Sequence, residues 1–147
     1  MSKVFVDTNI LVYCLDKFDL KKQENSRNLL HSLTNDAKGV ISTQVMQEFF
    51  VTATHKLGAD PLLIKDILRS FEQFEVVRVN PEMIYNAIDC NIINRISFWD
   101  SLIVVSAESS HCNTLWTEDL NDGQIIRGVR IENPLRDKQA SESPSES

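Results

Sequence analysis

Cysteine and histidine are scarce in this chain of 147 residues, which contains three of each. Cys14, Cys90 and Cys112 lie far apart, fall in apolar stretches and form no C-x-x-C pair. This spacing predicts reduced thiols that pack as small hydrophobic residues, in a domain that needs neither disulfides nor a structural metal. Reduced thiols are typical of cytoplasmic proteins, so we expect a cytoplasmic location.

A long uninterrupted apolar segment is also absent from the start of the sequence. Asp7 and Asn9 interrupt the first apolar run, and neither a basic segment nor a small-residue cleavage site accompanies it. The run therefore indicates neither a secretion signal nor a membrane span. It is typical of a buried strand that leads into a helix, and we expect no association with a membrane.

Positive charge is in deficit as well, because the formal net charge is −6. This deficit argues against general affinity for nucleic acid, which comes from lysine and arginine contacts to phosphates. A cation held among acidic residues would reverse the local field, and Lys21, Lys22, Arg127 and Arg130 would then provide surrounding contacts. The same four residues are more often ordinary solvated surface.

The length and composition predict one compact domain. A chain of 147 residues with 42% hydrophobic and 24% charged residues is large enough to bury a core. We expect the domain to cover residues 1–135. Residues 136–147 are rich in serine, glutamate and proline and are expected to be a disordered tail. The sequence contains no internal repeat.

Extended and helical patterns alternate along the chain, which favours an α/β fold with a mostly parallel sheet. Two helix starts are marked by a capping residue followed by proline, in Asp60-Pro61 and Asn80-Pro81. The predicted strands cover residues 4–6, 39–42, 75–79 and 114–117, with a short edge strand at 129–131. The predicted helices cover residues 24–33 and 43–57, and others begin at residues 61, 81 and 97.

Four carboxylates lie where apolar segments begin, end or turn: Asp7, Glu48, Asp100 and Asp119. Asp7 follows the first predicted strand, and the carboxyl ends of parallel strands meet at one edge of a sheet, where ligands usually bind. An all-oxygen ligand set without histidine or cysteine suits Mg²⁺ or Mn²⁺. The pattern therefore predicts a metal-dependent enzyme that cuts phosphodiesters.

Each of these acids also has an ordinary structural interpretation. Asp7 could close an Asx turn, and Glu48 could pack its stem on the protein while its head reaches water. Asp100 could complete a capping box with Ser97, and Asp119 could be the N-cap of a short helical turn. Their combination at one sheet edge is what favours a site.

Four short motifs occur in a fixed order. They are VDTNIL at 6–11, STQVMQEF at 42–49, SFWDSLI at 97–103 and TEDLNDGQ at 117–124, followed by Asn133-Pro134. In these motifs the chain resembles the PIN-domain ribonucleases, most closely the VapC-type toxins of bacterial toxin–antitoxin pairs. The resemblance extends from Val4 to Pro134.

The resemblance implies a three-layer α/β/α sandwich around a mostly parallel sheet, with the four acids in one pocket. It implies that Asp7 and Asp100 hold Mg²⁺, or Mn²⁺ as a substitute, and that Glu48 and Asp119 are the other two catalytic acids. Supporting polar positions match Thr8, Asn9 and Thr117. Asp122 is an alternative to Asp119, and the sequence leaves that choice open.

The same resemblance implies a metal-dependent endoribonuclease that is the toxin of a type II toxin–antitoxin system. It implies an RNA substrate, a small antitoxin partner, a homodimer and a helical hairpin clip over residues 61–74. Other possibilities remain: a stand-alone RNA-processing nuclease, a DNA-directed nuclease and a catalytically silent PIN-like binding protein. A response-regulator receiver would need paired acids after the first strand, where the chain has only Asp7.

Overall fold

The computed structural model describes residues 2–33 and 38–136. Apart from Arg136, the predicted tail lies outside the described residues. The strands are β1 (Lys3–Val6), β2 (Lys38–Ser42), β3 (Glu75–Val77), β4 (Thr114–Trp116), β5 (Ile125–Ile126) and β6 (Val129–Glu132). The helices are α1 (Thr8–Tyr13), α2 (Leu20–Leu33), α3 (Thr43–His55), α4 (Pro61–Ser70), the 3₁₀ turn η1 (Phe71–Gln73), α5 (Pro81–Asn94) and α6 (Phe98–Ser109).

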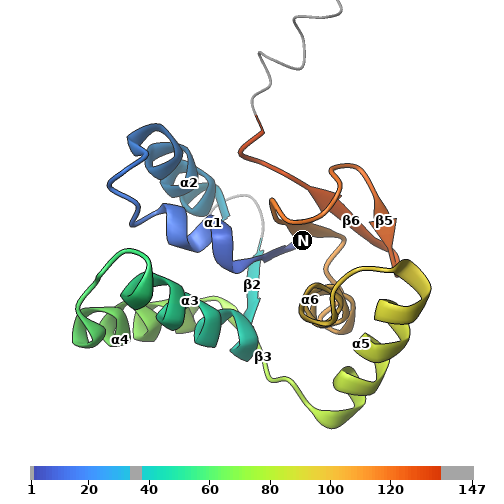
Figure 1. The fold of residues 1–147 in the computed structure, drawn as a ribbon. Coiled ribbons are helices and arrows are strands. Elements are labelled where there is room, and N and C mark those ends of the chain that lie inside the picture. The colour runs from blue at the N-terminus through green and yellow to red at the C-terminus, as the bar shows by residue number, and fades with distance from the viewer. Residues whose placement is uncertain (1, 34–37, 137–147) are drawn as a thin grey trace, which may run out of the picture.

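The strands form one sheet in the order β3-β2-β1-β4-β6-β5, parallel except for the β5–β6 pair. Helices α1 to α4 lie on one side of this sheet and α5 and α6 on the other (Figure 1). The predicted α/β sandwich with a mostly parallel sheet is confirmed. The chain runs outward from β1 to β3 and then returns to β4 beside β1. Open parallel sheets bind ligands at such a reversal of strand order.

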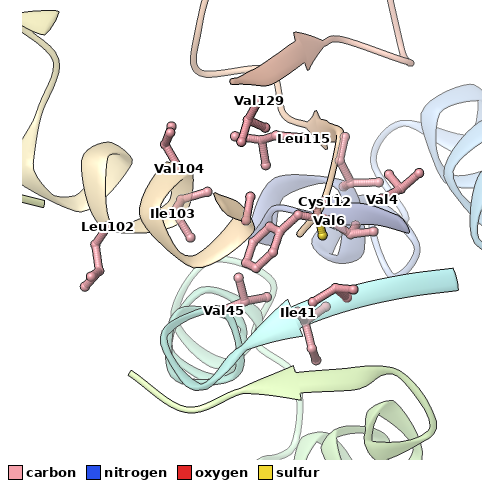
Figure 2. Close-up of a cluster of buried hydrophobic side chains, with 14 of the residues drawn as sticks. Val4, Val6, Ile41, Val45, Leu102, Ile103, Val104, Cys112, Leu115 and Val129 are labelled. Carbon is pink, nitrogen blue, oxygen red and sulfur yellow. The ribbon is translucent and has the colours of Figure 1, made fainter. Parts of the chain in front are cut away.

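The core fills the space between the sheet and its helices. Val104 of α6 packs near Leu115 and Val129 of the sheet (Figure 2). Cys90 and Cys112 are buried in this core, and all three cysteines are free, as predicted. Across the part of the chain that the structure describes, no helix is long and apolar enough to cross a membrane.

Side-chain caps fix where the helices that carry the acids begin. Ser42 Oγ accepts the backbone N–H of Val45 at 3.3 Å, and Ser97 Oγ accepts that of Asp100 at 3.0 Å. The predicted caps at Asp60 and Asn80 are also present, each followed by proline in the first turn. Such caps satisfy backbone donors that the first helical turn leaves free, so they set the helix starts from local sequence.

Several details of the predicted elements are wrong; for example, strand β3 ends at Val77 rather than at residue 79. Helix α2 begins at Leu20 rather than at residue 24, because the Asp19 carboxylate accepts the backbone N–H of Lys22 and caps an earlier start. Strand β6, predicted as an edge strand, is an interior strand, and β5 is the edge strand at that end of the sheet. Arg127 and Gly128, with φ angles of 51° and 79°, form the turn that joins the two. A two-residue hairpin turn needs such angles, but an arginine in this conformation gives little sequence signal.

The segment predicted as a helical hairpin clip contains α4 and η1. Helix α4 packs against α3, so the hairpin is formed by these two helices rather than within residues 61–74 alone. Phe71 of η1 lies edge-on to Phe49 of α3, with 5.0 Å between the ring centroids.

Candidate active site

Asp7 lies at the reversal of strand order, one residue after β1. Its backbone N–H donates to the carbonyl of Trp116, the last residue of β4, at 3.0 Å. The Asp7 side chain is 4% exposed. Its Oδ1 accepts the N–H of Thr8 at 2.7 Å, and its Oδ2 accepts the hydroxyl of Thr117 at 2.8 Å. The carboxylate therefore caps α1 and also joins the ends of two neighbouring strands.

Burial makes the charged form of Asp7 costly. It raises the pKa of this carboxyl from its ordinary value of 3.8 to about 7, although the hydrogen bonds from Thr117 and Thr8 act in the opposite direction. The negative charges of Asp119 and Glu48 raise the pKa of Asp7 further. Three acids from distant parts of the sequence therefore act on one another electrostatically.

Glu48 lies in the middle of α3 and is half-buried. Gln44, one turn earlier, donates from Nε2 to Glu48 Oε1 at 2.7 Å and to the carbonyl of Trp99 at 3.2 Å. Burial raises the pKa of Glu48, and the charges of Asp100 and Asp119 act in the same direction. Sequence reasoning missed Gln44, although its spacing of four residues from Glu48 places both on one helix face.

Asp100 lies in the first turn of α6, where its backbone N–H is bound by Ser97. The capping interpretation of this segment is therefore confirmed for the backbone. Burial raises the pKa of the Asp100 carboxyl, as does the charge of Asp119. The backbone of Asp100 is therefore part of the helix cap, while its carboxylate is close enough to Asp119 to interact with it electrostatically.

Asp119 and Asp122 have different environments. The backbone N–H of Asp119 donates to Thr117 Oγ1 at 3.0 Å, and no helix follows it, so the N-cap interpretation is wrong. Asp122 accepts the N–H of Asn133 at 2.8 Å and pairs with Arg136 at 2.9 Å. These contacts lower the pKa of Asp122. Its carboxylate is engaged by Asn133 and Arg136, and Asp122 is not in the lining that Asp7 and Asp119 share.

A cavity of about 350 Å³ brings several of these residues together. It is lined by Asp7, Thr8, Asn9, Val12, Tyr13, Asp16, Glu48, Thr52, Lys56, Leu57 and Asp119. Neither Asp100 nor Thr117 is part of this lining. Thr117 is connected to the cavity by its hydrogen bond to Asp7. A larger cavity of about 550 Å³ lies elsewhere, and the described residues that line it include no carboxylate. The cavity that Asp7, Glu48 and Asp119 share is therefore the candidate active site.

Polar atoms in this cavity lack partners. Thr8 Oγ1 and both amide atoms of Asn9 are buried without a hydrogen-bond partner among the described residues. Unsatisfied buried polar groups are rare in folded proteins and call for an explanation such as a bound ion or water. Both side chains were predicted as supporting residues, and the structure brings them to the same cavity as Asp7.

A hydrogen-bonded trio on the cavity rim was not predicted from the sequence. Tyr13 donates to Glu118 Oε1 at 2.6 Å, and Lys22 Nζ lies 3.1 Å from Glu118 Oε2 and 4.4 Å from the Tyr13 ring centroid. Burial and the contact with Glu118 raise the pKa of Tyr13. The trio ties the loop that carries Asp119 to α1 and α2.

Residues 4–123 match the PIN domain family, and the chain belongs to that family. A segment of 62 residues, 40% of the chain, is 42% identical to the centromere/kinetochore protein zw10 of Drosophila melanogaster. The match spans 9% of that protein, so the similarity concerns a small part of it.

Solved structures of VapC toxins and VapBC complexes have the same fold. VapC20 of Mycobacterium tuberculosis, a sarcin-ricin loop cleaving toxin, is 15% identical with a TM-score of 0.67, over 79% of this chain and 89% of that one. VapBC2 of Rickettsia felis, bound to promoter DNA, is 20% identical with a TM-score of 0.66, over 88% and 97%. DNA-bound VapBC of Salmonella typhimurium is 21% identical with a TM-score of 0.65, over 90% and 98%.

Proposed function

We propose that this protein is a divalent-metal-dependent endoribonuclease and the toxin of a type II toxin–antitoxin system. The observation that carries the proposal is the acidic cavity at the reversal between β1 and β4. There the buried Asp7 interacts electrostatically with Glu48 and Asp119. Membership of the PIN family and the shared fold with VapC structures support the same function.

The residues present fit Mg²⁺ or Mn²⁺. The donors are all oxygen atoms, and the unpartnered Thr8 and Asn9 side chains add polar groups beside Asp7. Within residues 2–33 and 38–136, no three acidic, histidine or cysteine side chains form a ready-made metal-binding group. We therefore infer that Asp7 and Asp100 hold the ion after the acidic side chains rearrange around it.

The acids have separate roles in the proposed hydrolysis of RNA. When held by Asp7 and Asp100, a divalent cation would neutralise charge on the phosphate and lower the pKa of a water molecule. Glu48 and Asp119 would orient the attacking water, and one of them would accept its proton; the raised pKa of Glu48 suits a general base. The water oxygen bonds to phosphorus as the bond to the 3′ oxygen breaks, and the departing 3′ oxygen takes up a proton from solvent, which leaves a 5′ phosphate and a 3′ hydroxyl.

Partners follow from the same proposal. The net charge of −6 suits an antitoxin whose basic or amphipathic segment covers the acidic cavity. A homodimer is supported by an apolar face on α5, where the exposed residues are Ile84, Tyr85, Ile88, Ile92 and Ile93. The family resemblance and the reduced thiols favour a cytoplasmic location.

Cleavage assays with matched variants test the activity. We expect the wild-type protein to cut unstructured RNA with Mg²⁺ or Mn²⁺ and to be inactive in EDTA. Asp7→Asn, Glu48→Gln, Asp100→Asn and Asp119→Asn should each lower the rate by at least about tenfold, and removal of a residue that acts in the transition state often costs more. Asp122→Asn is the matched control and should retain activity, because Asp122 pairs with Arg136.

Three results would contradict parts of this proposal. Undiminished cleavage by Asp119→Asn together with a loss in Asp122→Asn would reverse the assignment of the fourth acid. Cleavage of DNA alone would favour a DNA-directed nuclease. If the protein cuts RNA but binds no antitoxin encoded by a neighbouring gene, a stand-alone RNA-processing enzyme would be favoured.

A further inference from the structure

An aromatic side chain lies exposed beside the candidate active site. Trp99 immediately precedes Asp100 in α6 and is 64% exposed. Phe98 packs edge-on against its ring, with 5.1 Å between the ring centroids. Tryptophan has a large hydrophobic surface, so an exposed ring next to a catalytic acid is a candidate contact for a ligand.

Trp99 forms one wall of a hollow of about 380 Å³. The other lining residues are Gln44, Gln47, Glu48, Val51 and Thr52, all on α3. Glu48 and Thr52 line both this hollow and the acidic cavity, so the two sites adjoin one another. A ligand that reaches the acids can therefore place a neighbouring group against Trp99.

Gln44 fixes the two walls of this hollow relative to each other. It is 4% exposed, and its Nε2 donates to both Glu48 Oε1 and the carbonyl of Trp99. The Oε1 atom of Gln44 is buried and has no hydrogen-bond partner among the described residues. The start of α6 and the middle of α3 are thus held together, which gives Trp99 a defined place beside Glu48.

The residues that line the hollow suit the base of an RNA nucleotide better than its phosphate. The described residues around the hollow include no lysine or arginine, and Glu48 would repel a phosphate. A flat base, in contrast, can stack on an indole ring, rest against Val51 and exchange hydrogen bonds with the exposed amide of Gln47.

We propose that this hollow, formed by Trp99 and the Gln44–Thr52 face of α3, binds an unpaired nucleobase next to the bond that is cut. The proposal rests on the proposed ribonuclease function and names the residues of this chain that hold one base beside the site. The base stacks on Trp99, and the adjoining phosphodiester reaches the acids around Asp7. Paired bases are not recognised here, because their faces are occupied by stacking within the duplex.

Binding is measured in the Asp7→Asn background, with a labelled unstructured oligoribonucleotide and fluorescence anisotropy. Loss of one stacked base corresponds to about a tenfold weaker affinity, which Trp99→Ala should show. Trp99→Phe should restore part of the affinity. Phe18→Ala, which removes another exposed aromatic ring outside this hollow, is the matched control and should leave the affinity unchanged.

Cleavage kinetics separate this proposal from the function on which it rests. With Asp7 intact, Trp99→Ala should raise KM about tenfold on single-stranded RNA and change kcat little. Equal KM values for an active wild type and Trp99→Ala would overturn the base site alone. A wild type that neither binds nor cuts RNA would overturn both proposals. The base site is also overturned if Trp99→Ala alters sedimentation of the free protein without affecting its RNA affinity, because the ring is then a contact between copies.

Discussion

The hydroxyl of Thr117 joins the two acids that flank the central strands. It donates to Asp7 Oδ2 at 2.8 Å and accepts the backbone N–H of Asp119 at 3.0 Å. Thr117 is fully buried, and it lies 110 residues from Asp7 in sequence. One side chain thus sets the orientation of the Asp7 carboxylate and the course of the loop that carries Asp119.

Removal of that hydroxyl should cost both stability and activity. Thr117→Val leaves the buried Oδ2 of Asp7 without its partner, which costs about 1–3 kcal/mol, whereas the N–H of the exposed Asp119 can bind water instead. Urea unfolding should show a loss in that range, and RNA cleavage should fall more than in Thr117→Ser, which keeps the hydroxyl. Equal activity of the two variants would show that the hydroxyl does not position the acids.

Stability should depend on pH through Asp7. Folding raises the pKa of Asp7 from 3.8 to about 7, so the folded state binds the proton more tightly than the unfolded state between these values. The resulting stabilisation is fully present below pH 4 and is lost as the pH rises through 7. The change in pKa corresponds to roughly 4 kcal/mol. Chemical unfolding without metal, repeated from pH 4 to pH 8, measures the effect.

Asp7→Asn isolates this contribution from other titrating groups. The raised pKa values of Glu48 and Asp100 act in the same direction, whereas the lowered values of Glu75 and Asp122 oppose it. We expect the stability of the variant relative to wild type to increase as the pH rises from 4 to 7. A difference that stays constant over this range would show that Asp7 titrates normally in the folded protein.

Divalent metal should stabilise the folded protein at neutral pH. A ligand that binds only the folded state adds about 2.7 kcal/mol at a concentration one hundred times its Kd. We expect Mg²⁺ and Mn²⁺ to raise the melting temperature of wild type, with a smaller increase in Asp7→Asn and none in EDTA. A melting curve that is indifferent to all three conditions would contradict the proposed metal site.

Local signals in the sequence predicted most of the fold. Capping residues such as Asp60 and Ser97 satisfy backbone donors a few residues away, so they can be recognised without the tertiary structure. The acids at the sheet edge were predicted by a similar argument, because Asp7 directly follows a buried strand. The structure places Asp7, Glu48 and Asp119 on one cavity.

The remaining features depend on pairs far apart in sequence. Gln44 reaches Trp99 across 55 residues, and Tyr13 reaches Glu118 across 105. Neither pair has a spacing that identifies it, because their proximity follows from strand order and from side-chain positions. The sequence also left Asp119 and Asp122 as alternatives, and only the structure shows that Asp119 lines the cavity while Asp122 pairs with Arg136.

A close approach at Gly39, which pairs with Val4 near the start of β1, gives a test of the packing away from the acids. A Cβ atom at this position of β2 would lie 2.6 Å from Cδ1 of Phe74 and 3.2 Å from Cδ1 of Leu33. The Phe74 ring also contacts Phe71, with 6.0 Å between the centroids, and both rings line the larger cavity. A Cβ atom at position 39 therefore requires the Phe74 ring to shift.

Gly39→Ala should destabilise the protein by about 1–3 kcal/mol, the usual cost of an overpacked core. Denaturant unfolding measures the loss. RNA cleavage at a temperature where the variant is folded should be unchanged, because Gly39 lines the larger cavity that lacks carboxylates. In Gly39→Ala/Phe74→Leu the smaller leucine side chain makes room for the new methyl group. The double variant should therefore lose less stability than the sum of the losses in the two single variants. Strict additivity would show that Phe74 is not the group that excludes a side chain at position 39.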